Sequence, residues 1–179
     1  VSHAILYPES SPELSPRNKE IRKVAEDFLQ EYIREGMTDQ EKIKAVHDYL
    51  VRTIRYDSDL PVNLSPQSEN VSDSYMVYGA LVNKVAVCDG YAKAFTMFMD
   101  ILAIPSDRIV GLSLQNNNTV NHAWNRVYLD GDWKYLDVTW NDPVPDRGNS
   151  VQYDYYLVSE EKMEQDHSWE EDQFRVRYF

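Results

Sequence analysis

Residues 120–140 read VNHAWNRVYLDGDWKYLDVTW and contain the hairpin signal around which the rest of the chain is organised. The pair Asp130-Gly131 separates two segments rich in β-branched and aromatic residues. This arrangement is typical of a two-residue hairpin loop between antiparallel strands. We therefore predict a strand over 120–129 and a return strand over 132–140.

The register of this hairpin decides which side chains meet. If Leu129 pairs with Asp132, then His122 and Asp137 are diagonal neighbours on one face of the sheet. A slip of one residue would place them on opposite faces. A carboxylate beside an imidazole fixes the tautomer of the ring and stabilises the imidazolium. The hairpin thus predicts an oriented histidine, and the plainer alternative is a structural histidine with an aspartate that only caps or bridges.

The single cysteine, Cys88, lies in the segment VCDGYA at 87–92. We predict a mostly apolar helix over 88–103 that starts at this cysteine. Backbone N–H groups and the positive end of the helix dipole lower the pKa of a thiol at such a position and favour the thiolate. The same N–H groups could stabilise an oxyanion, and Gly90 would leave room for a substrate. The alternative is a small cysteine that only fills the core.

Two amphipathic helices are expected before the cysteine. The first begins at Pro16, with Ser15 as its N-cap, and ends at Gly36. A capping box, T-x-x-E at 38–41, opens the second helix, which runs to Ile54. Both helices are expected to form a scaffold.

The remaining segments give weaker signals. Pro8 and Pro12 favour an extended chain over 1–15. Residues 57–74 either shape a substrate cleft or form a surface connection. Further elements are expected in this order: a helical turn at 75–83, a strand at 108–114, a strand at 153–158, a short helix at 159–165 and an edge strand at 174–179.

Composition excludes several classes of protein. The chain has 179 residues, which suits a single domain over 1–179, and its formal charge of −12 argues against nucleic-acid binding. One cysteine excludes an internal disulfide framework and a multi-thiolate zinc site. No apolar run is long enough for a membrane span. Because the chain begins at Val1 rather than Met, a leader or an upstream domain could have been removed.

Three blocks, in this order, resemble one known family. They are VCDGYA at 87–92, NHAWN at 121–125, and GDW at 131–133 with DVTWND at 137–142. Together they resemble the core of the transglutaminase-like superfamily, in particular its bacterial, secreted or surface-attached branch. The resemblance implies an α+β fold with a papain-like core, in which a nucleophile helix packs on an antiparallel β-sheet next to N-terminal helices. The helical part would cover about 15–56, the catalytic core about 75–142, and a C-terminal strand and helix extension 151–179.

The resemblance also implies an activity. Cys88, His122 and Asp137 would form a catalytic triad that acts on peptide or protein amides through a thioester acyl-enzyme. Water would complete hydrolysis, or an amine would complete acyl transfer. The protein would be extracellular or at the cell surface, with no cofactor and no calcium. The alternative is a non-catalytic surface or peptide-binding module of the same fold.

Other residues near these motifs are candidates for smaller roles. Some members of the resembled family use an aromatic or amide side chain upstream of the cysteine in the oxyanion hole, so the resemblance implies Tyr78 or Gln67 as a donor. Trp124 could shield the His–Asp pair or fill the core. His167 is expected to be structural. A metal site at the triad is not expected, since two of the three ligands already explain one another as an ion pair. The acidic composition slightly favours cationic or amine-bearing substrates.

Overall fold

A four-stranded antiparallel sheet carries the hairpin predicted from residues 120–140. The structure is a computed structural model that describes residues 1–7, 13–60, 72–115, 117–144 and 150–170. The strands of the sheet follow the order β5-β4-β3-β6, and a separate parallel pair is formed by β1 and β2. The strands are β1 (Arg55–Tyr56), β2 (Val85–Ala86), β3 (Ser106–Gln115), β4 (Asn118–Leu129), β5 (Asp132–Leu136) and β6 (His167–Ser168).

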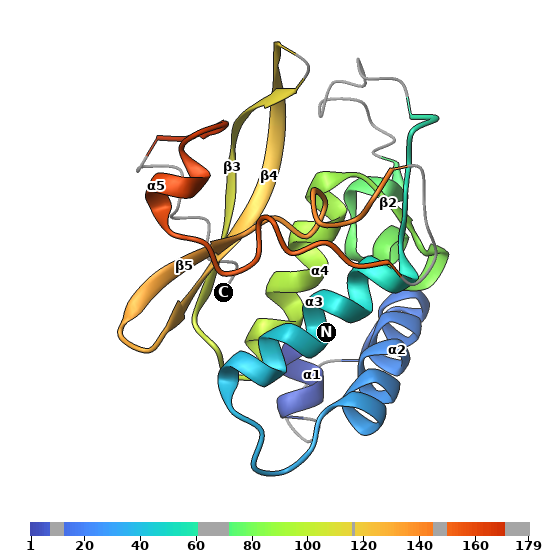
Figure 1. The fold of residues 1–179 in the computed structure, drawn as a ribbon. Coiled ribbons are helices and arrows are strands. Elements are labelled where there is room, and N and C mark those ends of the chain that lie inside the picture. The colour runs from blue at the N-terminus through green and yellow to red at the C-terminus, as the bar shows by residue number, and fades with distance from the viewer. Residues whose placement is uncertain (8–12, 61–71, 116, 145–149, 171–179) are drawn as a thin grey trace.

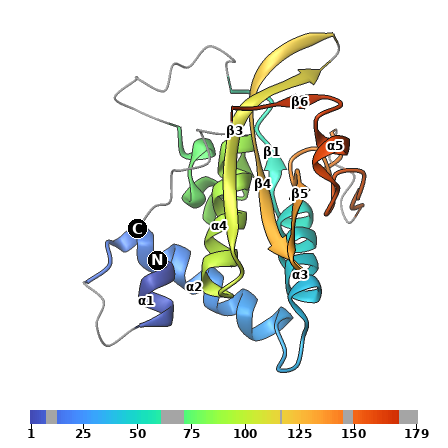
Figure 2. The same ribbon diagram turned by 90° about the vertical axis from the view of Figure 1, so that its left-hand side faces the viewer.

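Most of the helical structure lies on one side of this sheet. Figure 1 shows α2, α3 and α4 on that side and α5 on the other, and Figure 2 shows the long strands β3 and β4 with α4 beside them after a quarter turn. The helices are α1 (Ser2–Leu6), α2 (Pro16–Tyr32), α3 (Asp39–Thr53), α4 (Cys88–Ile101) and α5 (Glu160–Met163), with short η2 (Asp73–Tyr75) and η3 (Gly79–Asn83). The α+β fold class predicted from the sequence is confirmed. Within the described ranges, no helix combines the length and the apolar character that crossing a bilayer requires.

The register of the hairpin agrees with the sequence-based prediction. Leu129 pairs with Asp132, and the pairing continues to Asn125 opposite Leu136. The return strand is shorter than predicted because the chain turns at Asp137. The Asp137 carboxylate accepts hydrogen bonds from backbone N–H groups two and three residues later, and such Asx-type bonds compete with a β-ladder.

Helix α4 is the centre of the main core. Its buried side chains include Tyr91, Phe95 and Phe98, which pack with side chains of α2 and α3 and with the sheet residues Val127 and Leu136. The other face of the sheet buries a second cluster, which consists of Ile109, Trp124, Tyr135 and Met163. Both faces of the sheet are thus covered, one by the long helices and the other by α5.

The two scaffold helices begin where the sequence predicts. The Ser15 side chain accepts a hydrogen bond from the backbone N–H of Asn18 at the start of α2. Thr38 and Glu41 form the predicted capping box of α3. Because these local hydrogen bonds satisfy backbone groups at the helix ends, the starts of the helices could be predicted from a few residues.

Two sequence-based predictions of secondary structure are wrong. Residues 2–6 are helical rather than extended, because the two prolines on which that prediction rested follow the helix and do not interrupt it. Residues 153–158 form turns with an isolated bridge from Val158 to Tyr135 rather than a strand. This segment is held by other contacts, since the Tyr155 N–H donates to the Asn141 side chain and the Tyr153 hydroxyl donates to Asp48. The expected edge strand at 174–179 and most of 57–74 lie outside the described residues.

Candidate active site

His122 and Asp137 form a buried pair at the sheet. The His122 Nε2–H donates to Asp137 Oδ2 at 2.6 Å, and the side chains are 4% and 0% exposed. His122 lies on β4, and Asp137 directly follows the last residue of β5. The hairpin register therefore brings these two residues together, as the sequence analysis predicts.

The Asp137 carboxylate has donors on both oxygens. Oδ1 accepts the backbone N–H groups of Thr139 at 3.0 Å and Trp140 at 3.1 Å. Oδ2 accepts from His122, and His167 Nε2 lies 3.2 Å from the same oxygen. Burial alone would raise the pKa of Asp137, but the charges and hydrogen bonds of the two histidines outweigh it and hold that pKa well below its usual range.

The same pair determines the charge of His122. Burial disfavours the imidazolium, yet the Asp137 charge and hydrogen bond, followed by the interaction with Cys88, raise the pKa of His122 to about 10. The ring is therefore an imidazolium near neutral pH. Since Asp137 occupies Nε2, Nδ1 is the ring nitrogen left for the cysteine.

Cys88 is the first residue of α4, is partly buried, and has no disulfide partner. It lies close enough to His122 to help raise the pKa of that ring. The N-cap residue Val87 provides no side-chain cap for the first turn, so the end of the helix is open to another acceptor. The structure thus brings together the three residues of the predicted triad: Cys88, His122 and Asp137.

Gly90 has a different role from the one predicted. A Cβ at this position would overlap the backbone oxygen of Ser74 and lie 2.9 Å from the Ala86 Cβ. The space beside Gly90 is therefore filled by η2 and β2 and is not open for a substrate. Glycine at this position lets the start of α4 pack closely against the segment that precedes the cysteine.

Two tyrosines that the sequence analysis did not single out lie near Cys88. The parallel pairing of β1 with β2 sets Tyr56 opposite Ala86, two residues before the cysteine. Burial, then the charge of Cys88, raise the pKa of Tyr56 to about 12, and the same two causes raise the pKa of Tyr75. Both phenols therefore keep their protons and can donate hydrogen bonds near the thiol.

Tyr78 points elsewhere. Its hydroxyl donates to Glu20 Oε2 at 3.0 Å, and the Arg17 guanidinium lies 3.9 Å from the centre of its ring. The geometry therefore does not support Tyr78 as an oxyanion-hole donor. Gln67, the other residue proposed for this role, lies outside the described residues.

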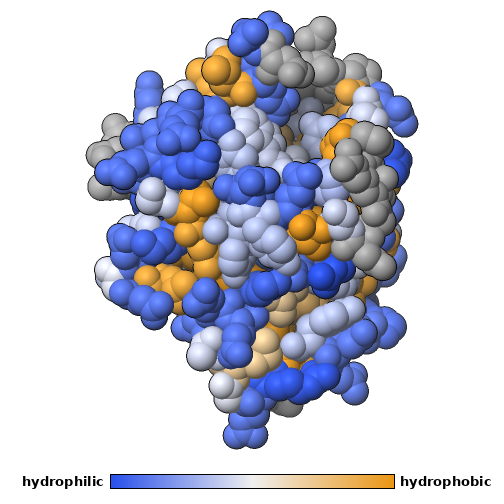
Figure 3. All heavy atoms as spheres, in the orientation of Figure 1, coloured by the Kyte–Doolittle hydropathy of each residue, from blue (hydrophilic) through white to orange (hydrophobic). Residues whose placement is uncertain are grey.

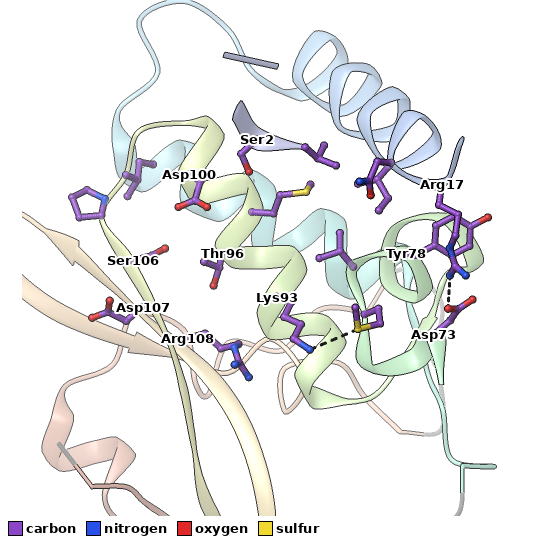
Figure 4. Close-up of a pocket in the computed structure, with 18 of the residues that line it drawn as sticks. Ser2, Arg17, Asp73, Tyr78, Lys93, Thr96, Asp100, Ser106, Asp107 and Arg108 are labelled. Atoms are coloured by element: carbon purple, nitrogen blue, oxygen red, sulfur yellow. Dashed lines mark hydrogen bonds and ion pairs between the residues drawn. The ribbon is translucent and has the colours of Figure 1, made fainter. Parts of the chain in front are cut away.

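Tyr78 instead lines a cavity of about 1110 Å³ between α1, α2, α4 and β3 (Figure 4). Lys93 and Arg108 also line this cavity and pair with Asp89, the residue after the cysteine. Among the described residues, the lining does not include the triad. This cavity is therefore separate from the cluster of Cys88, His122 and Asp137.

Two tryptophans flank the histidine. Trp124 is 1% exposed, and its ring lies 5.9 Å from that of His122 and 4.8 Å from that of His167. It is part of the second core cluster rather than an open cleft, and it shields both imidazoles from water. Trp140 is only partly buried and lies 5.6 Å from His122, so it is the tryptophan that can contact a substrate at this site.

His47 supports the loop that follows Asp137. The Asn141 amide donates to His47 Nε2 at 2.9 Å, and His47 Nδ1–H donates to Asp48 Oδ1 at 3.0 Å. Burial lowers the pKa of His47, which keeps one ring nitrogen free of a proton for Asn141. No local pattern in the sequence links α3 to residue 141, so this contact of His47 could not be predicted from the sequence.

The ligand atoms of His122, Asp137 and His167 all lie within 4.8 Å of one another, and these residue types can bind a metal ion. In this structure the same atoms are engaged in the hydrogen bonds described above. Those bonds account for the cluster without a metal.

Comparison with known proteins shows a consistent likeness. The family model of the transglutaminase-like superfamily matches residues 26–138. The human and mouse kyphoscoliosis peptidases are each 24% identical to the chain, over 129 and 132 residues, or 68% and 69% of the chain. The chain spans 19% of the length of each of these relatives.

Solved structures share the fold. A candidate cysteine protease from Cytophaga hutchinsonii aligns with a TM-score of 0.52 at 18% identity, and covers 74% of this chain and 42% of its own. A protein described as a TGase aligns with the same TM-score of 0.52 at 20% identity, and covers 77% of this chain and 36% of its own. At these identities the likeness is one of fold.

Proposed function

This chain belongs to the transglutaminase-like superfamily, and from that premise we propose that it is a cysteine-dependent amide hydrolase or acyl transferase. The proposed substrates are peptide or protein amides, and the proposed intermediate is a thioester on Cys88. One observation carries the proposal: His122 lies between the Asp137 carboxylate and the Cys88 thiol, with an elevated pKa. A thiolate paired with an imidazolium is the activated form of a cysteine nucleophile.

In the first step, the Cys88 sulfur attacks the carbonyl carbon of the amide. A carbon–sulfur bond forms, and the carbonyl π electrons move onto the oxygen. When the tetrahedral intermediate collapses, the carbon–nitrogen bond breaks and His122 Nδ1 gives its proton to the leaving amine. Asp137 keeps the other ring nitrogen protonated, so that only Nδ1 exchanges a proton.

In the second step, His122 acts as a base. It takes a proton from water or from an acceptor amine, which attacks the thioester carbonyl and releases the thiolate. Water gives hydrolysis and an amine gives transfer.

The developing oxyanion needs donors near Cys88. Backbone N–H groups of the first turn of α4 are one source, because the helix N-terminus has no side-chain cap. The protonated hydroxyls of Tyr56 and Tyr75 are a second source. These two tyrosines replace Tyr78 as our candidates for the side-chain donor.

The surface bears on the choice of substrate. The face shown in Figure 3 is mostly hydrophilic, and its apolar residues form small separate patches. With a formal charge of −12, the protein would attract cationic or amine-bearing partners more than anionic ones. An extracellular or cell-surface location and a peptide or protein partner are part of this proposal.

The test combines thiol reactivity with substrate profiling. The rate of Cys88 alkylation by iodoacetamide is measured against pH, and a reactive site alkylates rapidly below pH 7. An acyl-donor peptide library is then incubated with the wild type and with Cys88→Ala, with and without a primary amine. Amine-dependent products separate transfer from hydrolysis. A thiol that titrates at about 8.5 or above, together with no product that depends on Cys88, would refute the proposal and favour a non-catalytic binding module.

A further inference from the structure

A second histidine contacts the carboxylate that orients His122. His167 Nε2 lies 3.2 Å from Asp137 Oδ2, the oxygen that also accepts from His122. The His167 side chain is fully buried. Its other nitrogen, Nδ1, lies 2.7 Å from Asp166 Oδ1, and the Tyr155 hydroxyl donates to the second oxygen of Asp166. A continuous chain of hydrogen bonds thus runs from His122 through Asp137, His167 and Asp166 to Tyr155.

The two partners of His167 determine where its protons lie. Both ring nitrogens face carboxylate oxygens, and a carboxylate only accepts hydrogen bonds. Both contacts are therefore hydrogen bonds only when both nitrogens carry a proton. A ring with one bare nitrogen would set a lone pair against Asp137 or Asp166 in a buried site, which is costly.

The backbone holds His167 at this position. Strand β6 pairs with β3, with His167 opposite Ser113 and Ser168 opposite Leu112. Gly111 on β3 allows this close approach, because a Cβ there would overlap the Ser168 backbone oxygen and lie 2.8 Å from the Trp124 ring.

Aromatic rings enclose the imidazole of His167. The ring centres of Trp140, Trp124 and Tyr155 lie 4.4 Å, 4.8 Å and 5.5 Å from that of His167. The side chain consequently has little freedom to swing away from Asp137. A rigid donor on one oxygen limits rotation of the carboxylate and so limits movement of the His122 ring.

We propose that His167 is a positioning residue for the reaction at Cys88: its Nε2–H holds Asp137 Oδ2 in the plane and at the distance that His122 requires. The kinetic effects expected from this role rest on the proposed function. Because the His167 side chain is fully buried, we expect it not to touch the substrate. Its loss should therefore lower kcat and leave KM unchanged.

Two substitutions separate the two hydrogen bonds of His167. The amide nitrogen of His167→Gln can occupy the place of Nε2 and keep a donor on Asp137. The shorter side chain of His167→Asn places its amide near Nδ1, which keeps the Asp166 contact and removes the Asp137 donor. We expect kcat to fall about 10- to 100-fold in His167→Asn and less than about 5-fold in His167→Gln, as is typical for residues that orient a catalytic ligand.

The experiment measures kcat, KM, the rate of Cys88 alkylation at pH 6.5 and the thermal midpoint for both variants. Tyr135→Phe is the matched control, because Tyr135 belongs to the second core cluster and the hydroxyl that the substitution removes donates to Glu160, outside the hydrogen-bond chain of His167. It should leave kcat and the alkylation rate unchanged. Equal losses in the two His167 variants, or a larger loss in His167→Gln, would overturn the proposal, as would wild-type kcat in both.

Failure of this inference can be told from failure of the proposed function. If the wild type turns over no amide but Cys88 alkylation slows only in His167→Asn, the positioning role stands and the catalytic proposal fails. If neither variant folds, the ¹⁵N shifts of histidine-labelled wild-type protein decide. A protonated Nε2 on His167 supports the role, and a bare Nε2 facing Asp137 overturns it.

Discussion

Asp137→Asn is expected to lower kcat/KM by about 10³- to 10⁴-fold while the fold persists. The reason lies in the donors around the carboxylate. The N–H groups of Thr139 and Trp140 both point at Oδ1, so the single oxygen of an asparagine must take that position. The amide NH₂ then faces the Nε2 atoms of His122 and His167 and donates to them.

This orientation reverses the tautomer of His122. Its Nε2 must become an acceptor, so Nδ1 carries the only proton and cannot take one from the Cys88 thiol. Without the Asp137 charge, burial is opposed only by the interaction with Cys88, so the pKa of His122 falls from about 10 toward its ordinary value of 6.5. At about 1.4 kcal/mol per pKa unit, a full return to that value is a loss of roughly 5 kcal/mol in preference for the imidazolium.

The assay follows kcat/KM on the best library peptide and the alkylation rate of Cys88 between pH 5 and 9. The variant should show slow alkylation at pH 6–7 and a marked rise in rate only toward pH 9. Asp107→Asn is the matched control, because Asp107 is a partly buried carboxylate bound by Arg126 on the same sheet. Activity of Asp137→Asn within tenfold of wild type, or unchanged alkylation at pH 6.5, would show that the reasoning is wrong.

Three further outcomes follow from the same contacts. Gly90→Ala should lower the free energy of unfolding, measured by chemical denaturation, by about 1–3 kcal/mol. The steric overlap with the Ser74 backbone outweighs the roughly 1 kcal/mol gain in helix propensity. A more stable variant would contradict this prediction. Tyr56→Phe should lower kcat about 10- to 100-fold with little change in KM if its hydroxyl stabilises the oxyanion near Cys88, and unchanged kcat would remove it from that role. Folding raises the pKa of His122 from 6.5 to about 10, so the contribution of this residue to stability is complete below pH 6.5 and is lost as pH rises toward 10. The difference in unfolding free energy between wild type and His122→Gln should therefore shrink over that interval. A constant difference would count against the buried ion pair.

Local signals explain why the hairpin and the scaffold helices could be predicted from the sequence. Asp130-Gly131 sets a two-residue loop, and once the loop is known, pairing arithmetic places His122 beside Asp137. The N-cap of α2 and the capping box of α3 each depend on residues within one turn. Such features need no knowledge of the rest of the fold.

Features that depend on distant segments could not be predicted in this way. Tyr56 approaches Cys88 only because β1 and β2 pair, and two-residue strands leave no periodic pattern in a sequence. The same holds for β6, which brings His167 to Asp137 through its pairing with β3. Tyr78 is a candidate only because the resembled family can place an upstream aromatic side chain in the oxyanion hole, and in this fold its hydroxyl turns to Glu20 on α2.

The residues that hold Asp137 are divided between the matched family core and the segment after it. The family model ends at residue 138, which includes Cys88, His122 and Asp137. The backbone donors at 139 and 140, the Tyr155 carbonyl that accepts the Asp137 N–H, and His167 all come later. A buried carboxylate that loses such donors takes up a proton or rotates, and either change releases His122. The C-terminal segment through residue 168 is therefore part of what keeps Asp137 ionised beside the His122 imidazolium.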